Sequence, residues 1–174
     1  MISPTSPTLH ASSASPATAE GLAAQLGQAL LARGEKVVTA ESCTGGGVAM
    51  YMTSVSGSSR WFERGFVTYS NEAKMEMLGV SPQTLAAQGA VSAATVAEMA
   101  GGAIAHSRAD WSLAISGIAG PDGGSPDKPV GTVWFAWAGP RGIAKTERQL
   151  FAGDRQAVRE QAGRRAIEGL LELL

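Results

Sequence analysis

The stretch Val37-Val38-Thr39-Ala40-Glu41-Ser42-Cys43-Thr44-Gly45-Gly46-Gly47 decides the fold of this chain. It begins with a short apolar, β-branched run, which favours a buried strand. Hydroxyls, one thiol and three glycines follow, and a segment rich in helix formers begins at Val48. The order of strand, tight turn and helix is typical of α/β proteins, in which ligands bind at the carboxyl ends of strands. We therefore expect this turn to form the floor of an active site.

Length and composition indicate one soluble globular domain. The chain has 174 residues, of which 44% are apolar and 17% charged, and its formal net charge is -1. Such a charge provides no basic field for nucleic acid or an anionic membrane. The single cysteine excludes an internal disulfide and fits a reducing compartment. With no secretory signal and no apolar run near the roughly 18 residues of a spanning helix, we expect a cytoplasmic protein without membrane or nucleic-acid partners.

The order of predicted elements gives the fold class. Residues 1–17 are rich in Ser, Pro, Thr and Ala and predict a flexible arm, whereas residues 18–174 predict a single domain. Helices are expected at 18–33, 46–53, 71–78, 82–88 and 93–107 and after a cap at Asp154. Strands are expected at 36–40, 64–69, 111–115, 132–137 and 143–151. Alternating helices and strands followed by a hairpin predict a three-layer α/β/α sandwich with a mixed sheet.

Two nucleophiles stand side by side in the opening stretch. Ser42 lies where the strand gives way to the helix, and its position alone favours a helix cap over a nucleophile. Cys43 has the more reactive group, but only His10 and His106 exist to activate it. One lies in the predicted arm and the other late on a helix, so a buried structural cysteine is the better interpretation of Cys43.

Lys74 is the candidate general base. Ser70 and Asn71 both look like caps for the helix at 71–78. If Asn71 is the cap, Lys74 falls in the first turn, where the helix dipole disfavours a cation. This field, together with partial burial, would lower the pKa of Lys74 and favour the neutral amine. A surface lysine is the alternative, but no usable histidine exists and a Ser–Lys pair is the only activated hydroxyl that the chain offers.

Further polar candidates lie near predicted strand ends. Tyr69 and Asn71 follow the second strand, and the glycine-rich loop from Gly117 to Gly124 follows the third. Arg64 is a candidate anion partner, although such a residue is more often solvated or salt-bridged. The glycine turn lacks the lysine of a phosphate-binding P-loop and does not have dinucleotide-binding spacing. No His, Cys, Asp and Glu cluster has metal-ligand spacing, so no metal site is expected.

Five blocks of this sequence closely resemble the signature of the CinA C-terminal family. They occur in the family's order, and the resemblance covers residues 18–174. The blocks are Thr39–Gly46, Gly65–Lys74, Gly89–Ser92, Ser116–Gly124 and Lys128–Val133. Longer family members carry a molybdopterin-binding-like domain before this one. Since this chain has no room for that domain, it resembles the stand-alone members, and functions tied to the extra domain are not expected.

The resemblance implies a nicotinamide-nucleotide amidase of pyridine nucleotide salvage. Such an enzyme converts nicotinamide mononucleotide and water to nicotinate mononucleotide and ammonia, without a cofactor or metal. The family's catalytic serine and lysine map onto Ser42 and Lys74, and Tyr69 matches the tyrosine of the lysine block. We expect oxyanion donors near Thr44 to Gly46. The expected substrate-contacting residues are Glu41, Thr44, Gly45, Gly46, Arg64, Asn71, Ser116, Gly117, Ala119, Gly120, Asp122 and Gly123.

Two other functions stay open at this point. The first alternative is a non-catalytic nucleotide-binding module. The second is a Ser–Lys amidohydrolase that acts on another small amide. The distance between Ser42 and Lys74 discriminates the first, because catalysis requires them within hydrogen-bond reach. The nucleotide phosphate needs a cradle, from the Gly117–Gly124 loop, the helix start after Ser42, Arg64 or an arginine of another subunit. Four tryptophans and an apolar last helix are compatible with a homo-oligomer.

Overall fold

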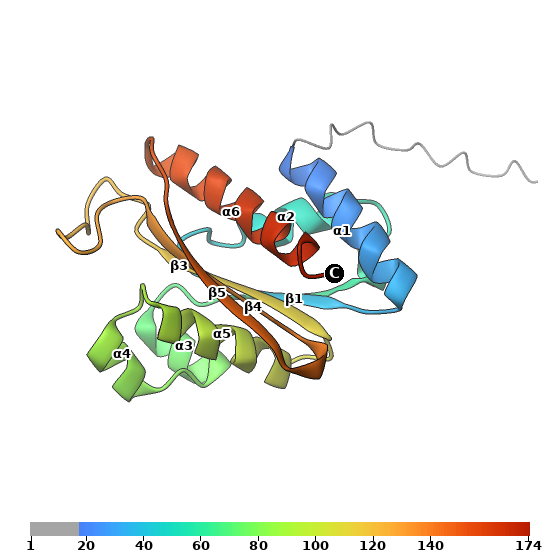
Figure 1. Cartoon of the computed structure of the whole chain (residues 1–174), viewed down its shortest axis with the longest axis horizontal. Coiled ribbons are helices and arrows are strands. Elements are labelled where there is room, and N and C mark those ends of the chain that lie inside the picture. The colour runs from blue at the N-terminus through green and yellow to red at the C-terminus, as the bar shows by residue number, and fades with distance from the viewer. Residues whose placement is uncertain (1–17) are drawn as a thin grey trace, which may run out of the picture.

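One mixed sheet of five strands organises the molecule (Figure 1). The computed structural model describes residues 18–174, and the arm predicted for residues 1–17 lies outside them. In sheet order the strands are β2 (Phe62–Val67), β1 (Val37–Glu41), β3 (Trp111–Gly117), β4 (Thr132–Gly139) and β5 (Ile143–Leu150). β1 pairs in parallel with β2 and β3, whereas β4 runs antiparallel to β3 and β5. The predicted mixed sheet is confirmed.

Helices cover both faces of this sheet (Figure 1). One face carries α1 (Ala19–Arg33), α2 (Gly47–Thr53) and α6 (Arg155–Leu171). The other face carries α3 (Asn71–Leu78), α4 (Pro82–Gln88) and α5 (Ala93–Ala105). Two short 3₁₀ turns, η1 (Ser58–Arg60) and η2 (Pro140–Gly142), complete the order. The three predicted layers are confirmed, and no helix within residues 18–174 is both long and apolar enough to span a membrane.

Alternation along the strands separates two apolar cores. On β3, Leu113 and Ile115 join the core beneath α1 and α6, while Ala114 joins the core beneath α5. The first core also contains the large buried side chains of Trp61 and Trp137. The second meets α5 through small residues, so this helix packs closely on the sheet. Because successive side chains of a strand point to opposite faces, one strand serves both cores.

Several predicted boundaries differ from the structure by one or two residues. β2 begins at Phe62 and ends at Val67, so it does not include Tyr69. Its neighbour β1 ends at Glu41, and the final ladder pair joins Glu41 to Val67. β3 instead continues to Gly117, because β4 keeps pairing with it beyond Ile115. α5 ends at Ala105, two residues before the predicted end. Ladder partners, which the sequence does not reveal, set the strand ends.

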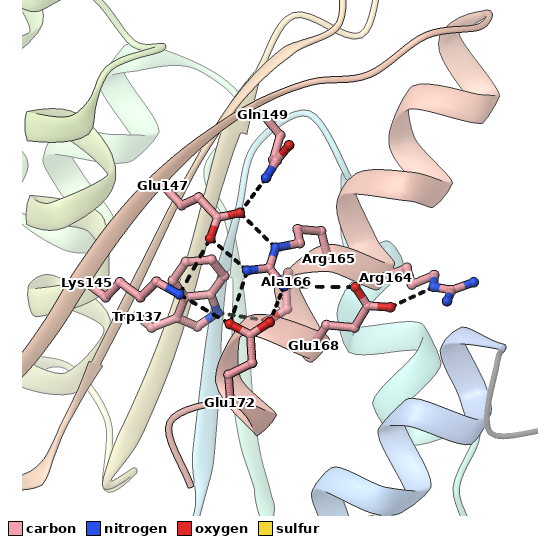
Figure 2. Close-up of polar contacts among 9 residues, drawn as sticks. All are labelled: Trp137, Lys145, Glu147, Gln149, Arg164, Arg165, Ala166, Glu168 and Glu172. Atoms are coloured by element: carbon pink, nitrogen blue, oxygen red, sulfur yellow. Dashed lines mark hydrogen bonds and ion pairs between the residues drawn. The ribbon is translucent and has the colours of Figure 1, made fainter.

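The carboxyl-terminal half of α6 is fixed to the sheet through Trp137. The indole Nε1 of Trp137 donates a hydrogen bond to the Ala166 carbonyl, at 2.8 Å. A Cβ at position 169 would overlap the same indole, so Gly169 permits this close approach. Figure 2 shows the ion pairs beside it: Arg165 bonds Glu147 of β5 at 2.7 Å and Glu172 at 2.6 Å. Hydrogen bonds and charge therefore join α6 to the edge strand.

The Glu147–Arg165 pair makes the stability of the folded state depend on pH in the acid range. The hydrogen bond from Arg165 lowers the pKa of Glu147 from 4.5 to about 2. A depressed carboxyl pKa stabilises the folded state above pH 4.5, and this stabilisation is lost as the pH falls towards 2. We expect Glu147→Gln to lower the free energy of unfolding by about 1–2 kcal/mol at pH 7. Urea unfolding of both proteins should show the difference shrinking below pH 4.5, and a difference that is constant with pH would contradict this origin.

Candidate active site

Glu41, the last residue of β1, organises the turn that follows it. Its buried carboxylate accepts hydrogen bonds from the backbone N–H groups of Gly46 at 3.0 Å, Val48 at 3.1 Å and Ala49 at 2.9 Å. It also accepts one from the Thr44 hydroxyl, at 2.6 Å. Gly46, at the cap position of α2, offers no side chain to these N–H groups. Glu41 therefore caps the helix from the preceding strand, whereas its expected role as a substrate contact stays a prediction.

Because Glu41 caps α2, the Ser42 side chain does not act as a helix cap. The turn closes with Gly45 and Gly46 at φ 61° and 92°, in the left-handed region that glycine adopts without strain. The helix starts at Gly47, well beyond Ser42, and its N-terminal N–H groups bond to Glu41. The alternative interpretation of Ser42 as a helix cap is therefore wrong.

The Ser42 hydroxyl lies against Lys74. The Lys74 ammonium donates to Ser42 Oγ at 3.1 Å and to the Thr68 carbonyl at 2.7 Å. Lys74 is only 1% exposed, and Ser42 is 8% exposed. The two side chains come from the carboxyl end of β1 and from α3, which begins shortly after the carboxyl end of β2. Their separation meets the hydrogen-bond reach that a nucleophile and its base require.

Burial lowers the pKa of Lys74 below its usual 10.5. The expected cause was different in part, because Ser70 and not Asn71 caps α3: Ser70 Oγ accepts from the Ala73 N–H. Lys74 thus lies one residue further along the helix than the first-turn placement assumed, and desolvation is the dominant cause of its shift. A lysine in this setting reaches its neutral, basic form more easily than an exposed one.

Cys43 has the opposite character. Desolvation raises the pKa of its thiol from 9.0 to about 11, so the thiol is protonated at neutral pH. The side chain belongs to the apolar core beneath α1 and α6. The predicted burial of Cys43 is confirmed, and its raised pKa disfavours the thiolate that a nucleophilic cysteine needs.

Arg159 of α6 donates hydrogen bonds to two backbone carbonyls of the turn after β1. Its Nε donates to the Cys43 carbonyl and its Nη2 to the Thr44 carbonyl, both at 3.1 Å. In a trans peptide the N–H points opposite to the carbonyl, so the Thr44 N–H is directed away from Arg159. Among residues 18–174 it donates to no acceptor, whereas the Gly45 and Gly46 N–H groups bond to Ser42 and Glu41. Of the three N–H groups in the predicted donor region, those of Gly45 and Gly46 are therefore already used within the turn.

A cavity of about 220 Å³ opens above the Ser42–Lys74 pair. Of the predicted residues, the structure places Tyr69, Ser116, Gly117 and Ala119 around it together with the pair. Its complete lining is Ser42, Cys43, Tyr69, Lys74, Ala90, Val91, Ser116, Gly117, Ala119 and Arg155. Apolar and small side chains next to a hydroxyl and an amine suit a flat ring that carries a polar group.

Other predicted contacts lie outside this cavity. Arg64 is paired with Glu63 at 2.6 Å and donates to the His106 carbonyl, because its place on β2 is opposite Val38 and away from the strand's carboxyl end. Asn71 is exposed at the first position of α3. Asp122 and Gly123 are exposed in the loop after β3, and neither lines the cavity. The structure therefore does not bring these four residues together with the Ser42–Lys74 pair, and their contacts with substrate stay predictions.

Sequence reasoning missed Ala90, Val91 and Arg155 of the cavity lining, and Arg155 is the one charged residue among them. It lies in the first turn of α6 and donates to the Gly120 carbonyl and to the Tyr69 hydroxyl, each at 2.9 Å. It thereby connects the loops that follow β2 and β3. The only signal in the sequence was the predicted cap at Asp154, which places Arg155 at a helix start. Within residues 18–174, no group of three His, Cys, Asp or Glu residues is arranged to hold a metal ion.

Fold and site together define an α/β protein with a buried serine–lysine pair at the carboxyl ends of parallel strands. The model of the CinA C-terminal domain matches residues 19–174. The chain belongs to this family.

Named relatives and a solved structure agree with the assignment. A curated Escherichia coli K12 protein named nicotinamide-nucleotide amidohydrolase PncC is 62% identical over 149 residues, covering 86% of this chain and 90% of the relative. One of the same name from Pseudomonas putida is 55% identical over 153 residues, covering 87% and 94%. The crystal structure of a competence/damage inducible protein from Agrobacterium tumefaciens has a TM-score of 0.89 and 43% identity, covering 93% of this chain and 99% of that one.

Removing the charge of Glu41 tests its capping role. We expect Glu41→Gln to lower the free energy of unfolding by about 2–3 kcal/mol, because an amide places donors against backbone N–H groups. Hydrogen exchange should accelerate at Gly46, Val48 and Ala49. Glu98→Gln is the matched control, since Glu98 accepts from Ser81 N–H and Thr84 Oγ1 at the start of α4. Unchanged exchange at the start of α2 in Glu41→Gln would refute the role.

Proposed function

We propose that this protein is a nicotinamide-nucleotide amidase, which hydrolyses nicotinamide mononucleotide to nicotinate mononucleotide and ammonia. It is a hydrolase that acts on a carboxamide C–N bond, as the names of relatives at 62% and 55% identity indicate. The observation that carries the proposal is the 3.1 Å contact between Lys74 Nζ and Ser42 Oγ at the base of the cavity.

In the proposed first step, neutral Lys74 takes the proton of the Ser42 hydroxyl. The Thr68 carbonyl holds one N–H of the amine at 2.7 Å and so orients the group towards Ser42 Oγ. The oxygen then attacks the carboxamide carbon of the nicotinamide ring. One C–O bond forms, and the carbonyl electrons move to the amide oxygen to give a tetrahedral oxyanion.

The oxyanion needs a donor that is fixed before the reaction. In this proposal it is the Thr44 N–H, because the neighbouring carbonyls are bonded to Arg159. An aimed donor of this kind typically lowers the barrier by about 3 kcal/mol. Preorganisation matters here, since a peptide already oriented does not have to rotate during the step.

Collapse of the intermediate releases ammonia. The proton held by Lys74 passes to the leaving nitrogen, directly or through Tyr69, and the C–N bond breaks. Water then attacks the nicotinoyl–serine ester, with Lys74 again taking a proton, and the acid and free Ser42 are released. Ser116 lines the same cavity.

We also propose that the protein is cytoplasmic and that it forms homo-oligomers. Size-exclusion chromatography with light scattering tests the second directly.

Ammonia release from nicotinamide mononucleotide tests the proposed chemistry. With EDTA in every assay, wild type should be active, and Ser42→Ala and Lys74→Ala should each lose about 10³-fold or more of kcat. Cys43→Ala separates the two nucleophiles, because the loss should follow the hydroxyl and not the thiol. Activity that survives Ser42→Ala but not Cys43→Ala would transfer the role to the thiol. An inert wild type that binds the nucleotide would favour the binding module instead.

The pH dependence tests the role of Lys74. Because the base must be neutral, kcat/KM should rise with pH as Lys74 loses its proton, with a midpoint below the usual lysine value of 10.5. Rates from pH 6 to 10 locate this limb, with circular dichroism confirming that the protein stays folded. A rate that does not change over this range would exclude titration of Lys74 as the source of activity.

A further inference from the structure

Two walls of the reaction cavity come from separate segments of the chain. Ala90 and Val91 belong to the α4–α5 turn, residues 89–92, whereas Ala119 belongs to the loop after β3, residues 118–131. The two segments border the same cavity, so a contact between them outside it fixes how far apart the two walls stand.

Lys128, in the loop after β3, makes such a contact. Its Nζ donates a hydrogen bond to the carbonyl of Gln88, the last residue of α4, at 2.8 Å. The last carbonyls of a helix have no partner within the helix, and the helix dipole favours a cation beside them. A Cβ added at Gly89 would lie 3.6 Å from the same nitrogen, so the ammonium also lies against the first residue of the α4–α5 turn.

The loop after β3 holds Lys128 in a defined position. At the base of the loop, the Ile118 N–H donates to the Thr132 carbonyl at 2.9 Å, and the Gly131 N–H donates to the Ile118 carbonyl at 2.8 Å. Further along, Ser125 and Lys128 exchange backbone hydrogen bonds at 2.9 and 3.2 Å. The Lys128 side chain therefore extends from a backbone that is already ordered.

The wall formed by Ala90 and Val91 depends on the residues that flank it. Within the part of the chain that the structure describes, no hydrogen bond holds the backbone N–H groups of these two residues. The Gly89 carbonyl accepts from Thr95 Oγ1 at 2.7 Å and from Ser92 Oγ at 3.1 Å, which joins the turn to α5. The carbonyl one residue earlier is bonded to the loop after β3. The wall is therefore fixed from α5 on one side and from this loop on the other.

We propose that Lys128 is a positioning residue that sets the width of the reaction cavity and so the affinity for a flat aromatic ring. This inference rests on the proposed function, in which the nicotinamide ring lies between these walls. An apolar wall contacts the ring equally before and during the reaction, so its placement affects binding more than the chemical step. The hydrogen bond between Ser42 and Lys74 involves neither wall.

Steady-state kinetics with nicotinamide mononucleotide test this role. We expect Lys128→Ala to raise KM about 5–10-fold and to change kcat less than about 2-fold, because binding common to the ground state and the transition state is lost. Lys128→Arg keeps a long cationic donor and should restore most of the wild-type KM. Arg148→Ala is the matched control, because Arg148 donates to the Asp127 carbonyl at 3.1 Å and so holds the same loop from β5 and not from α4. Its KM should equal that of wild type.

An unchanged KM in Lys128→Ala, or an equal rise in Arg148→Ala, would overturn the positioning role. Calorimetry of nicotinate mononucleotide with the same variants provides a readout that needs no turnover. Its affinity should fall about 5–10-fold in Lys128→Ala and stay at the wild-type value in Arg148→Ala. A wild type that releases no ammonia, together with this pattern of binding, would refute the proposed function and preserve the role of Lys128.

Discussion

The active-site turn depends on one buried carboxylate. Glu41 is the last residue of β1, and it binds the first N–H groups of α2 across the turn that carries Ser42. Helices usually obtain such a cap from a side chain immediately before their first turn. Here the cap comes from the strand, so strand, turn and helix become one rigid unit. The side chains of Ser42 and Cys43 in the turn are not needed as caps, and both line the cavity.

Burial gives adjacent side chains opposite chemical roles. It lowers the pKa of Lys74, whose charged form is disfavoured away from water, and it raises that of Cys43 for the same reason. The amine therefore moves towards its basic form, while the thiol becomes less nucleophilic. The Thr68 carbonyl satisfies one donor of the amine, so the group stays buried without losing all its hydrogen bonds. One physical effect selects the hydroxyl over the thiol as the candidate nucleophile.

Local patterns predicted the elements, the layers and the meeting of Ser42 with Lys74, because strand ends and helix starts have chemical signatures. The remaining features depend on contacts between distant residues. The role of Glu41 required knowing that its carboxylate turns back onto α2. Arg159 reaches the turn only because α6, more than a hundred residues later in the chain, packs over it. The same packing brings Arg155 to Tyr69. The pairing of Arg64 with Glu63 likewise depends on the register of β2 against β1, which sets its place along the sheet.

The contact between Gly169 and Trp137 has a consequence for the active-site turn at the other end of α6. It fixes the far end of α6, whereas Arg155 and Arg159 occupy the opposite end of the same rod. A helix rises about 1.5 Å per residue, so the anchor and the arginines are roughly 15–20 Å apart. A side chain at position 169 would push this end of α6 away from the Trp137 indole and so tilt the helix axis. A small tilt at the indole would displace the guanidinium groups at the other end. The geometry of the active-site turn is thus open to change from a position that lies far from it along α6.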